Sequence, residues 1–235
     1  MRALVIAHEP DGGAGQIGVR LLQRGFDVDT HIVTHDYERP NVADPLPDLA
    51  AYDLIIPMGS IRSLTDTDEI GSWVHDELRA LGAAHHRGTP ILGVCFGGQL
   101  MADVLGGRVE RSPVTEIGWF EIEAVGTTVN PVGPGPWKQW HHDRFEPPPG
   151  AEVLATTDDA AQLFRLGKTV GTQFHPEVDL AHIEAFLAQT PDEYLDENGL
   201  VREEIRAAAA AREEANIEQC HALVDWFLDD VAFPD

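Results

Sequence analysis

The sequence has few basic residues and few cysteines, and it contains no long apolar run. Lysine and arginine number 16 against 40 acidic residues, which gives a formal net charge of −24. A surface this acidic repels phosphate backbones and anionic lipid headgroups, so neither a nucleic acid nor a membrane surface is expected as a partner. Two cysteines make no disulfide framework, and no stretch approaches the roughly 20 apolar residues of a membrane helix. We therefore expect a cytoplasmic protein.

What the sequence does contain is ordinary globular composition, with 43% hydrophobic and 24% charged residues. At about 100–200 residues per domain, 235 residues predict a single domain, 1–235. Apolar runs typical of buried strands alternate with amphipathic stretches typical of helices: strands at 3–7, 28–33, 53–59 and 90–95, helices at 14–24 and 68–87. This alternation predicts a parallel sheet in an α/β fold.

The pattern changes after Gly107. Short strand-like runs follow one another, separated by glycine and proline turns: 119–125, 138–143, 152–157, 162–166 and 169–174. They predict an added, partly antiparallel section whose last strand returns to the main sheet. The proline-rich stretches 129–137 and 146–150 predict loops, because proline fixes φ and lacks an amide hydrogen.

A helical pattern begins at Asp179. It predicts a short helix at 180–188, a turn at 190–199, and then one bent helix or two across 200–231. We divide the chain into a core, 1–187, and a helical C-terminal extension, 188–235. The apolar faces of the extension must be buried somewhere. We expect residues 217–231 to close the core and 192–214 to supply a subunit interface, so a homo-oligomer remains open.

The sharpest chemical signal surrounds Cys95, where an apolar strand runs through two glycines into a helix of small residues. Glycines beside a nucleophile permit a tight strand–turn–helix with unusual backbone angles. This turn places the thiol at a helix N-terminus, where the helix dipole favours thiolate, and it points the amide of Phe96 towards a developing oxyanion. A structural cysteine that ends a core strand would not need glycine at 93, 97 and 98.

A nucleophilic thiol needs a base, and the base needs an orienting group. His175 ends an apolar strand, and Glu177 lies two residues further on, after Pro176. Residues i and i+2 of an extended backbone share a face, so the carboxylate can reach the imidazole and fix its tautomer. Without the turn at Cys95, the same residues would be interpreted as a solvated turn.

The run Gly-Val-Cys-Phe-Gly-Gly-Gln, followed about 80 residues later by Phe-His-Pro-Glu, resembles the class I (triad-type) glutamine amidotransferase family. The likeness extends from residue 1 to about 187. It implies a flavodoxin-like three-layer sandwich with a mostly parallel central sheet and extra C-terminal helices. Two departures stand out: Gly59-Ser60-Ile61 replaces the family's usual Gly-Gly-Pro, and no synthetase sequence follows, as in a stand-alone member.

The resemblance also assigns roles to individual residues. It implies Cys95, His175 and Glu177 as the catalytic residues, and the amides of Gly59 and Phe96 as the oxyanion donors. It implies substrate contacts from Gln99 and from the Glu-Ile-Gly-Trp segment, through Gly118 and Trp119. His141 belongs to a stretch similar to the family's His-x-Asp, and it either lines the substrate pocket or makes a structural polar contact.

The implied reaction is hydrolysis of the γ-carboxamide of glutamine through a cysteine thioester, with release of ammonia and with no metal or organic cofactor. Three alternatives remain open. The chain is a glutaminase component that feeds a separate synthetase subunit, a stand-alone γ-glutamyl peptide or amide hydrolase, or a non-catalytic binding module of the same fold. An intact triad argues against the last of these.

Other patterns have simpler explanations. Residues 13–18 read Gly-Ala-Gly-Gln-Ile-Gly, as in dinucleotide-binding loops, but Glu9 and Asp11 would repel phosphate, so we expect close helix packing beside the active site. The pairs His85-His86 and His141-His142 point apart and do not predict a metal site. Cys220 shares a helix face with Leu223, Val224 and Phe227 and is expected to pack in the core.

Overall fold

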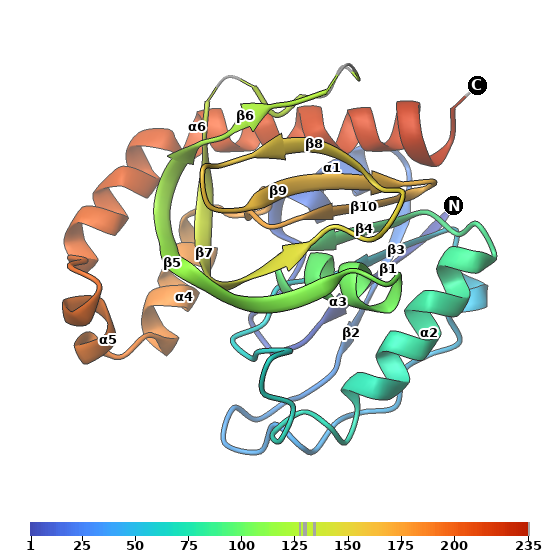
Figure 1. Cartoon of the computed structure of the whole chain (residues 1–235), viewed down its shortest axis with the longest axis horizontal. Helices are drawn as coiled ribbons and strands as arrows, with labels where there is room; N and C mark the ends of the chain where they lie inside the picture. Colours follow the sequence, from blue (N-terminus) through green and yellow to red (C-terminus); the bar gives the residue numbers. More distant parts are fainter. Residues whose placement is uncertain (127, 129–130, 134, 235) are drawn as a thin grey trace.

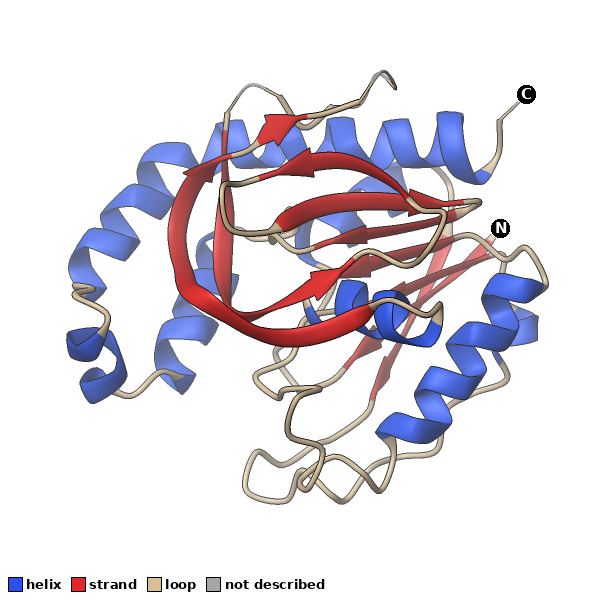
Figure 2. Ribbon diagram, viewed as in Figure 1, coloured by secondary structure: helices blue, strands red, loops and turns tan. Residues whose placement is uncertain are grey.

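The computed structural model describes residues 1–126, 128, 131–133 and 135–234. In this part of the chain, eight strands form one sheet in the order β2-β1-β3-β4-β10-β9-β8-β6 (Figures 1 and 2). The first five strands of that order are parallel to one another, and the last three continue the sheet in antiparallel pairs. The sheet strands are β1 (Arg2–Ala7), β2 (Asp27–Ile32), β3 (Leu54–Pro57), β4 (Ile91–Val94), β6 (Glu123–Ala124), β8 (Glu152–Thr156), β9 (Ala161–Leu166) and β10 (Thr169–Thr172).

Helices cover both faces of the sheet and form its outer layers. One face carries α1 (Gly15–Gln23) and α6 (Arg202–Trp226), whose apolar residues share a core cluster with strands β1, β3, β4 and β10. The other face carries α2 (Val74–His86) and α3 (Phe96–Val104), which bury a second cluster. A 3₁₀ turn, η1 (Leu49–Ala51), precedes β3. The predicted three-layer α/β fold with a mostly parallel central sheet is confirmed.

Two long strands leave the sheet and form an arm beside it. They are β5 (Arg108–Glu121) and β7 (Pro136–Glu146), which pair antiparallel and curve around one end of the molecule (Figure 2). The predicted return of the last strand is confirmed, because β10 pairs parallel to β4. The loop predicted at 129–137 contains residues 129, 130 and 134, which lie outside the described residues, and its last two residues already belong to β7.

Among the element boundaries that differ from the sequence prediction, two concern helices. The helix predicted at 68–87 begins only at Val74, because Trp73 has a non-helical backbone (φ −135°) and its indole donates to the Pro40 carbonyl. The turn predicted at 190–199 contains a short helix, α5 (Asp192–Glu197). Acidic residues occupy its first turn, where the helix dipole stabilises negative charge.

The C-terminal extension packs on its own chain. Helix α6 is continuous and ends in a π-helical turn, η2 (Phe227–Ala232), and its second half buries Cys220, Leu223 and Phe227 in the core, as expected. Its first half packs with α4 (Leu180–Gln189) and α5 in a third cluster under Trp119 and Trp140 of the arm. The apolar edge of 192–214 is covered within the chain, and the subunit interface expected there stays a prediction.

Candidate active site

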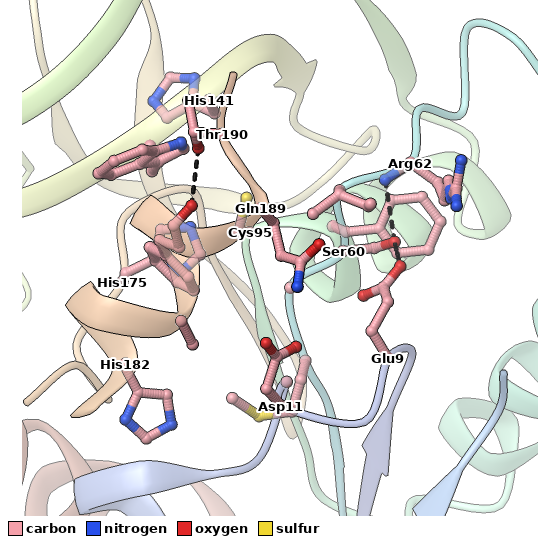
Figure 3. A pocket seen from close by; sticks show the side chains of 18 of the residues that line it. Glu9, Asp11, Ser60, Arg62, Cys95, His141, His175, His182, Gln189 and Thr190 are labelled. Carbon is pink, nitrogen blue, oxygen red and sulfur yellow. Dashed lines mark hydrogen bonds between the residues drawn. The ribbon is translucent and has the colours of Figure 1, made fainter. Parts of the chain in front are cut away.

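A cavity of about 220 Å³ opens where the parallel strands end. Its lining includes Glu9 after β1, Gly59 after β3, Cys95 after β4 and His175 after β10. In open parallel sheets, ligands bind at the carboxyl ends of the strands, because chain segments far apart in sequence converge there. Figure 3 shows Cys95 and His175 facing this space, with Glu9, Ser60 and Arg62 on the opposite side.

Cys95 occupies a strained turn between β4 and α3. It is the only non-glycine residue with a positive φ in the described part of the chain (φ 50°, ψ −105°). Its neighbours must be glycines, because a Cβ on Gly97 would lie 1.9 Å from the Pro57 carbonyl oxygen, and one on Gly98 would lie 2.5 Å from that of Thr172. The turn is thus wedged between β3 and β10, and such strain of about 1–3 kcal/mol is typical of functional sites.

His175 and Glu177 form a buried pair beside this turn. The imidazole Nδ1 lies 2.7 Å from Glu177 Oε1, and the two residues are only 5% and 2% exposed. Burial would lower the pKa of His175, but the charge of Glu177 and the thiol of Cys95 outweigh it and raise that pKa to about 10. With Nδ1 engaged by Glu177, the remaining ring nitrogen of His175 is available to Cys95.

The glycine loop at 13–18 braces Glu177 instead of holding a nucleotide. The Gln16 amide donates to the Glu177 carbonyl at 3.0 Å. A Cβ on Gly15, whose φ is +45°, would lie 2.3 Å from the same carbonyl oxygen. The expected close packing beside the site is confirmed, and an amide at the start of α1 that a phosphate would need is already engaged.

Both expected oxyanion donors lie at the cavity. Gly59 lies close to both His175 and Cys95, because a Cβ on Gly59 would lie 3.0 Å from His175 Cε1 and 3.8 Å from Cys95 Cβ. Phe96 is the first residue of α3, where backbone amides have no partner within the helix. The arrangement therefore brings two backbone amides, a thiol and an imidazole around one space.

The expected substrate-binding residues divide into two groups. Gln99 and His141 line the cavity. His141 is also held on both ring nitrogens, by the Asp143 carbonyl at 3.0 Å and by Glu116 Oε2 at 2.9 Å, so it makes both kinds of contact that were left open.

Gly118 and Trp119 do not lie among the cavity-lining residues. Gly118 pairs with Gln139 across the arm. Trp119 packs over the ammonium of Lys138, whose Nζ lies 4.6 Å from the ring centroid. The register between β5 and β7 turns this segment towards the C-terminal helices, so the substrate contact expected of it has no support in the geometry.

Several residues of the site were not expected from the sequence. Gln173 donates to Cys95 Sγ at 3.8 Å and lies 3.5 Å from Gln99 Nε2. The sequence could have indicated Gln173, because it lies two residues before His175 and so shares a face with it in an extended backbone. Ser60 donates to Glu9 at 2.6 Å, and burial raises the pKa of Glu9. The far wall comes from the extension: Gln189, Thr190, Pro191 and Tyr194.

Neither histidine pair belongs to a metal site in the described residues, where no three His, Cys, Asp or Glu side chains are grouped to hold an ion. His85 instead hydrogen-bonds Thr169 Oγ1 at 2.8 Å. None of the helices described is both long enough and apolar enough to span a bilayer.

Comparison with known sequences identifies the family of the chain. The family model for class I glutamine amidotransferases matches residues 16–189, about three quarters of the sequence, so the chain belongs to the class I glutamine amidotransferase family. A GMP synthase (glutamine-hydrolysing) from Aeropyrum pernix is 36% identical over 157 residues, 58% of this chain and 30% of that protein. A related GMP synthase from Herminiimonas arsenicoxydans is 37% identical over 145 residues, 53% of this chain and 24% of that protein. The chain therefore spans less than a third of these relatives.

Solved structures share the fold over nearly the whole chain. A glutamine amidotransferase from Thermotoga maritima has a TM-score of 0.83 at 24% identity and covers 97% of this chain and 98% of its own. A glutamine amidotransferase from Methylobacillus flagellatus has a TM-score of 0.80 at 23% identity and covers 98% of this chain and 95% of its own. The C-terminal helices are thus part of a fold that these proteins share.

Proposed function

We propose that this chain hydrolyses the γ-carboxamide of glutamine through a thioester at Cys95 and releases ammonia. One observation carries the proposal. A strained cysteine at a cavity contacts an imidazole whose other nitrogen is 2.7 Å from a buried carboxylate. Family membership supports the same chemistry. We further propose that residues 1–235 act as one domain, because the second half of α6 is buried in the core.

In the first half of the reaction, the sulfur of Cys95 attacks the carboxamide carbon. The carbonyl oxygen becomes an oxyanion held by the amides of Gly59 and Phe96. His175 carries a proton at neutral pH, because its pKa is raised to about 10, and it gives that proton to the departing nitrogen. The C–N bond breaks, ammonia leaves, and a γ-glutamyl thioester remains.

In the second half, water attacks the thioester carbon. Acylation removes the negative charge on Cys95, which is one of the causes of the raised pKa of His175. The imidazole, neutral after giving its proton to ammonia, accepts a proton from the attacking water. Loss of the charge on Cys95 lowers the pKa of His175, which keeps the ring in the neutral form that a general base needs. Glutamate leaves, and the thiol and imidazole recover their starting states. Glu177 orients the ring in both halves.

The test is turnover of glutamine and of a panel of γ-glutamyl amides and peptides by the purified chain, with ammonia, amine and glutamate measured. A glutamine-mimicking electrophile tests Cys95 separately by mass spectrometry. We expect glutamate release and a covalent adduct on Cys95. A chain that turns over no substrate and forms no such adduct contradicts the proposal and leaves the non-catalytic binding module.

A second candidate is a stand-alone γ-glutamyl peptide or amide hydrolase. It is favoured by the far wall of the cavity, which the C-terminal extension supplies through Gln189, Pro191 and Tyr194. A leaving group larger than ammonia would contact these side chains across a cavity of about 220 Å³. Faster turnover of a γ-glutamyl dipeptide than of glutamine would select this candidate.

A separate synthetase subunit is the partner that the first candidate requires. The similarity to GMP synthases, of which this chain matches less than a third, supports such a partner. Affinity purification that finds a stable ATP-using protein, and a rise in glutaminase activity on its addition, would support the pairing. Full activity of the isolated chain without any partner would count against it.

A further inference from the structure

A second buried histidine–glutamate pair lies beside Gly59, the residue expected to donate its amide to the oxyanion. His8 follows β1 and is 0% exposed, and Glu77 of α2 is 1% exposed, although 69 residues separate them in the sequence. His8 Nε2 lies 3.2 Å from Glu77 Oε1, and His8 Nδ1 lies 3.1 Å from the carbonyl oxygen of Gly59. The reaction described above uses neither side chain.

Both ring nitrogens of His8 face acceptors. A backbone carbonyl and a carboxylate accept hydrogen bonds and do not donate them, so the ring satisfies both only when each nitrogen carries a proton. Burial would lower the pKa of His8, but Glu77, the neighbouring charge of Glu9 and the Gly59 carbonyl outweigh it and raise that pKa above its ordinary value. His8 is therefore an imidazolium that donates to Gly59.

The ring is held in one orientation. Its centroid lies 4.8 Å from that of Phe96, in an edge contact, and 5.7 Å from that of Trp73, in a stacked contact. The His8 carbonyl accepts from both the amide and the hydroxyl of Thr34, at 3.1 and 2.7 Å. Neither the backbone nor the side chain of His8 can shift without breaking these contacts.

The two peptide groups that flank Gly59 are each held by a hydrogen bond to their carbonyl oxygen, one from Gly97 and one from His8. The Met58 carbonyl accepts from the Gly97 amide at 3.0 Å, and a trans peptide directs the Gly59 amide away from that carbonyl. The following carbonyl, that of Gly59 itself, accepts from His8. The direction of the Gly59 amide depends on both contacts, and in the described part of the chain His8 supplies the second.

We propose that His8, held by Glu77, is a positioning residue that aligns the Gly59 amide with the oxyanion of the reaction. The inference rests on the proposed hydrolysis of γ-glutamyl amides. A buried ion pair carries a large desolvation cost, and apolar side chains would fill the same volume without it. Alignment of a backbone amide explains why a charged pair occupies this place.

The test compares two reactions of Cys95, only one of which forms an oxyanion. Hydrolysis of the best γ-glutamyl substrate forms one, whereas alkylation by iodoacetamide displaces iodide at a saturated carbon and does not. In His8→Leu we expect kcat to fall by about 10–100-fold, since loss of an oxyanion donor costs about 10²–10³ and misalignment costs less. KM and the alkylation rate should stay within about threefold of wild type, as for an interaction made only in the transition state.

Two further variants separate alignment from packing. His8→Asn retains a side-chain donor for the Gly59 carbonyl and should recover part of the lost kcat. His31→Leu is the matched control, because the charge of Glu77 also acts on the pKa of His31 of β2, and it should leave kcat within about twofold of wild type. Equal falls in kcat and alkylation rate in His8→Leu would indicate general disruption and overturn the inference.

Glu77→Gln serves if His8→Leu does not fold. Without the Glu77 charge, the pKa of His8 falls, so the ring loses its second proton at a lower pH than in wild type. The charges of Glu9 and Glu77 act on His8, and the charge of Glu77 also acts on His31. A neutral ring carries one proton that is shared between its two nitrogens, so the donor to the Gly59 carbonyl is lost in part of the molecules. The kcat of this variant should therefore decline at a lower pH than that of wild type.

The outcomes distinguish the inference from the function on which it rests. An inactive wild-type chain removes the proposed hydrolysis, and the role of His8 with it. An active wild-type chain whose kcat is unchanged in His8→Leu, or an unchanged pH profile in Glu77→Gln, overturns the role of His8 alone.

Discussion

The turn around Cys95 and the long helix around Cys220 both bury a thiol, yet they differ in every other respect. Cys95 is 5% exposed, has strained backbone angles and lies at a cavity beside an imidazole. Cys220 is 0% exposed in regular helix α6, where burial and then the charge of Glu177 raise its pKa well above the ordinary value. Burial alone therefore does not decide whether a thiol reacts, because access and a nearby positive charge do.

The two regions also depend on different forces. At the turn, backbone groups approach so closely that a Cβ has no room at Gly97 or Gly98. In the second half of α6, apolar side chains such as Leu223 and Phe227 fill a broad core. A change at the turn should thus affect chemistry first, and a change in the helix should affect folding first.

The largest expected effect is loss of the fold in a chain that lacks residues 217–235. The deletion removes at least five buried apolar side chains, each contributing about 1.5–3 kcal/mol, which together match a typical net stability of about 5–15 kcal/mol. We expect insoluble protein on expression. A control that lacks only 234–235 should remain soluble, and a soluble, active chain without 217–235 would contradict the core assignment.

Substitution of each cysteine in turn distinguishes a role in the reaction from a role in core packing. Cys95→Ser should lower turnover by about 10⁴-fold or more, as loss of a nucleophile does, without changing the folded state. Cys220→Ala should retain activity and lower the free energy of unfolding by about 1 kcal/mol, because it leaves a small cavity. Steady-state kinetics and thermal melts measure both. Wild-type turnover by Cys95→Ser would exclude the thioester.

Glu177→Gln tests how the negative charge of Glu177 acts on His175 beside the turn. It should lower kcat by about 10²–10⁴-fold, because the ring of His175 loses its orientation and its stabilising charge. The pKa of His175 should fall from about 10, so the alkaline decline of the pH–rate profile moves to lower pH. In wild type the corresponding stability is complete below about pH 6.5 and is lost as pH rises through about 10. An unshifted profile would contradict this role.

Selective alkylation compares the thiols within one molecule. Iodoacetamide should modify Cys95 at least about 100-fold faster than Cys220, whose thiol is inaccessible and has a raised pKa. Brief labelling followed by peptide mass spectrometry gives the ratio, and labelling in denaturant should abolish the difference. Faster modification of Cys220 than of Cys95 in the folded chain would contradict the assignment of Cys95 as the reactive thiol.

The smallest expected effect concerns Lys138, which supports the arm against the C-terminal helices. Its ammonium lies 4.6 and 4.3 Å from the ring centroids of Trp119 and Trp140, and burial lowers its pKa to about 7. Between about pH 7 and 10.5 the unfolded chain binds the extra proton, so this group makes the fold more stable as pH rises.

Lys138→Met should remove that dependence and stabilise the fold by about 1–2 kcal/mol at pH 7. Denaturant unfolding at pH 7 and pH 10 measures it, and we expect the advantage to shrink at the higher pH. A variant less stable than wild type at pH 7 would mean that the two cation–π contacts outweigh the burial cost.

Much of the site was open to prediction because its parts are local in sequence. Cys95 is marked by its own glycines, and Glu177 lies two residues from His175, so backbone geometry alone brings each group together. The segment at Gly118 and Trp119 was assigned by resemblance, and the register of the arm turns it away from the cavity. Gln173 was missed although its spacing from His175 carried the same information as that of Glu177.

The sequence by itself determined the alternation of strands and helices, the strained turn at Cys95 and the pairing of His175 with Glu177, because each depends on neighbours a few residues apart. Only the tertiary structure decided that Gln16 braces Glu177, that residues 189–194 close the cavity, and that His8 joins Glu77 to the Gly59 carbonyl. These contacts join segments up to 161 residues apart, from Gln16 to Glu177, and they form only when helices and strands pack. Local periodicity carries no information about which distant side chains then meet.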